Sequence, residues 1–70
     1  MDRKNIIQLL ENKFIEYIAK MDASSDRQKQ ILFATMACEV AEVLAKINGC
    51  GIDEQHNNLY NKYNLWKFDN

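Results

Sequence analysis

The sequence contains no proline and only two glycines among 70 residues. These two residue types interrupt helices and build tight turns more than any others. Their scarcity disfavours a fold of many short strands and favours a few long helices. A hydrophobic content of 47% is too high for a disordered chain. We therefore expect one all-α domain over residues 1–70, whose small core benefits from contact with a second molecule.

An excess of charge of one sign is also missing. Nine Lys and Arg residues stand against ten Asp and Glu residues, which gives a net charge of -1. Such a chain lacks the positive field that draws proteins to phosphate backbones or anionic lipid. Direct binding to nucleic acid is therefore not expected.

No apolar run is long enough to cross a bilayer. The longest one, residues 31–47, is interrupted by Thr35, Glu39, Glu42 and Lys46, and a helix of that length spans only about 25 Å. The first residues lack the uninterrupted apolar core of a secretory signal. We expect a cytoplasmic protein without a membrane partner, and the frequent Asn, Lys and Ile residues indicate a bacterial or phage origin.

Cysteine and histidine are scarce, with Cys38, Cys50 and His56 as the only examples. Cys38 is expected inside a helix and Cys50 just past its end, about 15 Å away, which disfavours a disulfide. The spacing lacks the close pairs of structural zinc sites, and Cys38 is expected to be buried. Cys50 with His56 is a conceivable nucleophile and base, but Asp53 and Glu54 disfavour a thiolate there. We expect no catalytic residue, no cofactor and no metal site.

The first of three helices is predicted over about residues 5–21. Its apolar side chains recur at steps of three and four residues, at Ile7, Leu10, Phe14, Tyr17 and Met21. Glu16 and Lys20 on another side can form an ion pair one turn apart. This pattern is typical of an amphipathic helix.

The second helix is predicted over about residues 26–48. Ser25 and Gln28 match a capping box at its start, and Gly49 can adopt the left-handed conformation that ends helices. Together with the first helix it should form a helical hairpin.

A shorter third helix is predicted over about residues 53–63, with Asp53 as its N-cap. Several asparagines are poor helix formers, so the helix is expected to fray near Tyr63. Residues 64–70 then form an aromatic C-terminal tail. Within it, residues 65–68 are too few for periodicity to distinguish a helix from an extended chain.

The second helix is apolar over more than half of its circumference. One flank has large side chains, at Phe33, Met36, Val40, Val43 and Ile47, and the next has small ones, at Ala34, Ala37, Cys38, Ala41 and Ala45. One further helix and a short tail cannot easily cover this arc, and small side chains let another helix approach closely. We therefore predict a homodimer or a complex with another protein. The predicted interface comprises Ala34, Ala37, Cys38, Ala41, Ala45, Tyr60, Trp66 and Phe68.

Acidic residues offer two metal-dependent alternatives. Glu39 and Glu42 form an E-x-x-E step like that of all-helical nucleotide pyrophosphatases, which would make the chain a small metal-dependent nucleotide hydrolase. No second carboxylate pair follows on a facing helix, so a solvated stripe is the preferred interpretation. Residues 53–64 resemble a calcium loop in their first ligands, yet Asn58 and Asn64 stand where glycine and glutamate are needed.

A nucleic-acid role has one argument against it and one for it. In a helix-turn-helix centred on Gly49, Gln55 and Asn58 would fall at buried positions, and Asp53 would repel phosphates. Scattered residues of the second half occur in an order that resembles the Hha/YmoA family of small helical modulators that bind nucleoid proteins. These residues are Ser25-Asp26, Ala41-Glu42, Asn58, Leu59-Tyr60, Lys62 and Trp66-Lys67-Phe68, and the match requires an insertion between Glu42 and Asn58. The resemblance implies a co-regulator that acts through another protein, with Tyr60 and Trp66 in the core.

The leading hypothesis is a non-enzymatic protein–protein interaction module, namely a small regulator, inhibitor or chaperone that acts by helix–helix contact. The alternatives are a transcriptional co-regulator associated with nucleic acid and the small nucleotide hydrolase.

Overall fold

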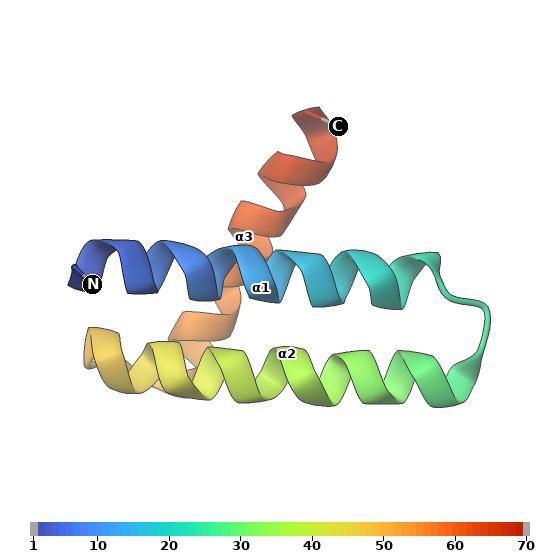
Figure 1. Ribbon diagram of the computed structural model, residues 1–70, viewed down its shortest axis with the longest axis horizontal. Coiled ribbons are helices and arrows are strands. Elements are labelled where there is room, and N and C mark those ends of the chain that lie inside the picture. Colours follow the sequence, from blue (N-terminus) through green and yellow to red (C-terminus); the bar gives the residue numbers. More distant parts are fainter. Residues whose placement is uncertain (1, 70) are drawn as a thin grey trace.

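The computed structural model describes residues 2–69, which form three α-helices. These are α1 (Arg3–Ala23), α2 (Arg27–Asn48) and α3 (Ile52–Asp69). α1 and α2 lie side by side as an antiparallel hairpin, and α3 crosses both steeply, so that its C-terminal end extends beyond α1 (Figure 1). The all-α fold expected from the sequence is confirmed. Within residues 2–69, no helix combines the length and apolar character that a bilayer crossing requires.

Local hydrogen bonds explain where α2 begins and ends. The N-cap is Asp26 and not Ser25, because the Asp26 carboxylate accepts a hydrogen bond from the backbone N–H of Gln28 at 2.9 Å. A carboxylate at this position also interacts favourably with the positive end of the helix dipole. Gly49 ends the helix in the left-handed conformation, with φ of 68°, as its sequence position indicates.

α3 is longer than the sequence suggests. It starts at Ile52, one residue before the expected N-cap Asp53, and residues 64–69 continue it as helix; Asn70 lies outside the described residues. Two side-chain contacts, each between residues about one helical turn apart, support this end of α3. The Tyr63 and Trp66 rings stack with centroids 6.0 Å apart, and the Lys67 ammonium lies 5.9 Å from the centroid of the Tyr63 ring. Such contacts offset the low helix propensity of the asparagines.

The core forms where α3 crosses the hairpin. Its buried members come from all three helices: Phe14, Ile18, Ala37, Ala41, Leu44, Leu59 and Tyr63. Phe14 makes edge-to-face contacts with His56 and Tyr60 of α3, with ring centroids 6.0 and 5.4 Å apart. Because Ala37 and Ala41 have short side chains, the neighbouring helices can pack closely against α2.

Polar contacts hold α3 on the hairpin. The Lys62 ammonium pairs with the carboxylate of Glu11, which is itself buried. The Tyr63 hydroxyl donates a hydrogen bond to the Asp22 carboxylate. This bond, together with burial, raises the pKa of Tyr63 to about 12.

Replacement of Ala41 by glutamate should unfold the chain. Ala41 is completely buried, and an unpaired carboxylate there would cost at least about 3 kcal/mol. Ala34→Glu is the matched control, because Ala34 lies on the same helix but is exposed. Circular dichroism should show lost helicity and cooperativity for A41E alone; a folded A41E would contradict this core.

Tyr63→Phe should lower stability at pH 7 by about 1 kcal/mol, because it removes the hydrogen bond to Asp22. The folded-state pKa of Tyr63 is raised to about 12, whereas that of an unfolded chain is about 10. The stabilisation is therefore complete below pH 10 and is lost as the pH rises toward 12. Urea unfolding at pH 7 to 11.5 should show the gap between wild type and Y63F narrowing above pH 10, and a constant gap would refute the assignment.

Candidate functional site

The structure divides the predicted interface residues between the core and the surface. Ala37, Ala41 and Ala45 have exposed fractions of 1, 0 and 7%. The other five, Ala34, Cys38, Tyr60, Trp66 and Phe68, are exposed. Most of the small flank of α2 is therefore covered by the chain's own helices, and among the eight predicted interface residues only these five are accessible to another molecule.

The hairpin has one side that α3 does not cover. α3 contacts α1 through Glu11, Phe14 and Asp22 and contacts α2 through Cys38 and Asn48. At 100° per residue, helical geometry turns a second set of apolar residues away from those positions. We call this set the open face: Ile6, Leu10, Tyr17, Leu32, Phe33, Met36, Val40, Val43 and Ile47.

Exposure on the open face is concentrated at three of its nine residues. Leu32 is 55% exposed, Val43 is 47% and Ile6 is 37%. The other six members are partly buried, and Leu10, Tyr17 and Val40 among them also pack against the core. Across the face, the rings of Tyr17 and Phe33 stack with centroids 6.5 Å apart and so join α1 to α2. On the large flank of α2, Val43 is exposed, while Phe33, Met36, Val40 and Ile47 are partly buried.

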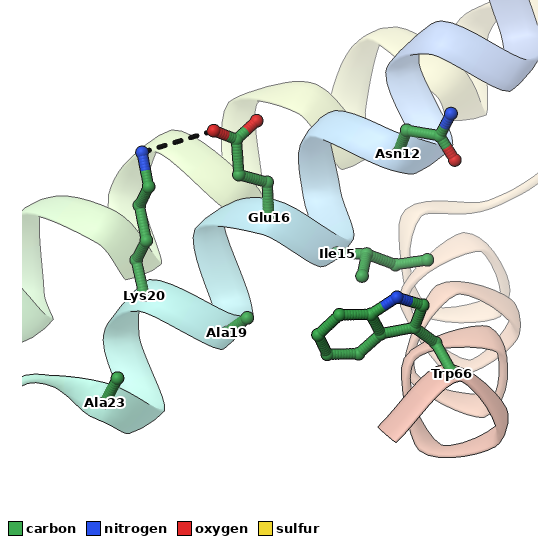
Figure 2. Close-up of a pocket in the computed structure, with 7 residues that line it drawn as sticks. All are labelled: Asn12, Ile15, Glu16, Ala19, Lys20, Ala23 and Trp66. Atoms are coloured by element: carbon green, nitrogen blue, oxygen red, sulfur yellow. Dashed lines mark ion pairs between the residues drawn. The ribbon is translucent and has the colours of Figure 1, made fainter. Parts of the chain in front are cut away.

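The end of α3 forms a second apolar region. Leu65 and Phe68 are 69% and 90% exposed, since this end extends beyond α1 (Figure 1). Trp66 turns back toward α1 and borders a cleft of about 430 Å³ with Ile15 and Ala19. Figure 2 shows its indole beside Ile15. The aromatic tail therefore has one residue packed against the fold and two that face solvent.

Charged residues border the cleft on the α1 side. Glu16 pairs with Lys20 at 3.2 Å, as predicted, and also with Lys13 at 3.3 Å (Figure 2 shows the Lys20 pair). Hydrogen bonds from Lys20 and Lys13 lower the pKa of Glu16. All three side chains are about half exposed, so the pairs contribute little to stability.

His56 lies beside Cys38 and not beside Cys50. The Cys38 Sγ is 3.5 Å from the His56 Nε2, and Cys38 is exposed although the sequence suggested burial. Cys38 lies at the edge of the contact between α2 and α3. The periodic apolar pattern of the sequence does not by itself distinguish such an edge position from a core position. Cys50 instead donates a hydrogen bond to the Gln55 side chain at 3.3 Å. Both thiols are free.

The acidic candidates do not assemble into a metal site in one chain. Glu39 and Glu42 are exposed and line a shallow depression next to Cys38. Residues 53–64 are helical and so cannot form a calcium loop. In the described part of the chain, no three His, Cys, Asp or Glu side chains are close enough to hold a metal ion together.

Comparisons of the chain with protein-family models, with curated proteins and with solved structures found no match. No family model therefore supports the resemblance to the Hha/YmoA family. One of its implications can be compared with the structure: Tyr60 and Trp66, expected in the core, are 41% and 42% exposed.

Proposed function

We propose that the chain is a non-enzymatic protein-interaction module of the cytoplasm that binds an amphipathic helix on its open face. The observation that supports this proposal is that this face, on the side of the hairpin away from α3, leaves Ile6, Leu32 and Val43 exposed among six partly buried apolar residues. Singly exposed apolar residues are normal on a protein surface, whereas a continuous apolar face is typical of an interaction site.

A helix is the occupant that fits this geometry. α1 and α2 lie side by side (Figure 1), and the apolar side chains of two such helices can pack against a third helix. On the other side of the hairpin, α3 packs against both helices in this way, although it crosses them steeply (Figure 1). Leu32, Val43 and Ile6 would each lose their remaining exposure on binding. Each would contribute about 1 kcal/mol, since full burial of such a side chain is worth about 1.5–3 kcal/mol.

The borders of the open face are polar. At 100° per residue, Lys13 and Lys20 of α1 lie along one edge, and Glu39 and Lys46 of α2 lie along the other. An apolar centre with a charged rim is the usual anatomy of a protein interface. The rim would orient an incoming helix, while the apolar centre would supply most of the affinity.

A second copy of the chain is the simplest partner, because it carries the same face and a symmetric contact needs no other protein. A small regulator, inhibitor or chaperone would use the same face on a different partner. The two free cysteines agree with a reducing compartment such as the cytoplasm.

The double variant Leu32→Lys with Val43→Lys should abolish self-association without unfolding the chain. Both residues are about half exposed, so lysine is tolerated in the monomer but places two charges at the centre of the contact. Thr35→Lys, on the polar side of α2, is the control. Sedimentation equilibrium in EDTA at about 1–100 µM should give dimers for wild type and T35K and monomers for the double variant.

A wild-type chain that remains monomeric throughout that range would exclude the second copy as the partner. A photo-crosslinking residue at position 43, compared with one at the exposed position 28, then tests for a different protein in cells. Equal crosslinking at both positions would count against the open face as a binding site.

A further inference from the structure

Cys38 and His56 present two zinc-ligand atoms at a suitable separation. Their Sγ and Nε2 atoms, from α2 and α3, are 3.5 Å apart. In a tetrahedral site with Zn–S of about 2.3 Å and Zn–N of about 2.0–2.1 Å, sulfur and nitrogen lie about 3.5 Å apart. A zinc ion could therefore bind both atoms without a change in the spacing of the two helices.

The His56 ring is held in place by its neighbours. It stacks on Tyr60 with centroids 6.2 Å apart and an angle of 23° between the planes. It also meets the buried ring of Phe14 edge-on. A ligand whose orientation is fixed before binding loses less conformational freedom when the metal arrives.

The surroundings of this pair are accessible and acidic. Cys38 is exposed, and one turn before it Ala34 leaves room for an approaching molecule. Ile31, Glu39 and Glu42 line the same depression, to which no Lys or Arg contributes. Two copies brought together here would repel each other through their carboxylates, and a divalent cation between them would offset that repulsion.

Each chain supplies only two ligands, because no third His, Cys, Asp or Glu of residues 2–69 joins the pair. We propose that Cys38 and His56 are half of a zinc site that a second copy completes as a Cys2His2 tetrahedron. Two thiols release their protons to solvent, and the two thiolates neutralise the Zn²⁺ charge. Zinc thus links two chains through the side of α2 that carries Ala34 and Cys38, away from the open face.

The test uses the reduced, full-length Leu32→Lys/Val43→Lys variant, in which the open face cannot contribute to association. Zn²⁺ titration should bind one ion per two chains and convert monomers to dimers in sedimentation, and EDTA should reverse this. Co²⁺ should give the absorption bands of a tetrahedral site with thiolate ligands. In the same background, Cys38→Ser should weaken binding at least about tenfold, whereas Cys50→Ser should have no effect.

His56→Gln provides a second loss-of-ligand variant, with circular dichroism to show that it still folds. If the His56→Gln variant does not fold, the test relies on Cys38→Ser alone. That variant should fold, because the Cys38 side chain is exposed. Zinc binding that is insensitive to Cys38→Ser, or that reaches one ion per chain without dimers, would overturn the shared site. Neither result would affect the proposal for the open face, which is measured in EDTA.

Discussion

The arrangement depends on how the apolar circumference of α2 is divided among its neighbours. α1 lies against one part of it, and α3 crosses on the side where the side chains are small, so that Ala37, Ala41 and Ala45 are buried. No helix of the described chain covers the side where Leu32 and Val43 lie, and both remain about half exposed. The other two helices, α1 and α3, enclose α2 on two sides, and the third side belongs to the open face.

The direction of α3 follows from a few specific contacts. Gly49 reverses the chain in a conformation that suits glycine, and α3 then runs across the hairpin toward Glu11 and Asp22 of α1. One result is a well-enclosed core around Phe14. Another is the juxtaposition of Cys38 and His56, which come from different helices and lie beside each other only because α3 crosses at this angle.

Much of this fold could be predicted from the sequence, because helix periodicity and caps are local signals. The three helices, the end of α2 at Gly49 and the Glu16–Lys20 pair belong to this group. The extent of α3 was harder to predict, since the asparagines disfavour a helix while ring contacts at Tyr63 support one. Which flank of α2 contacts α3 is determined by packing between helices and not by local sequence signals. Small side chains allow close packing against a helix of another chain as well as against one of the same chain. The burial of Ala37 and Ala41 and the exposure of Cys38 could therefore not be predicted from the sequence.

The central claim is that the open face binds a second helix-bearing molecule, and a dilution series of two-dimensional amide NMR spectra in EDTA tests it residue by residue. Concentration-dependent shifts should be confined to the open face, including Leu32, Met36 and Val43, and should be absent along the polar side at Gln28 and Thr35. Shifts located only at the α3 side of the hairpin would contradict the account.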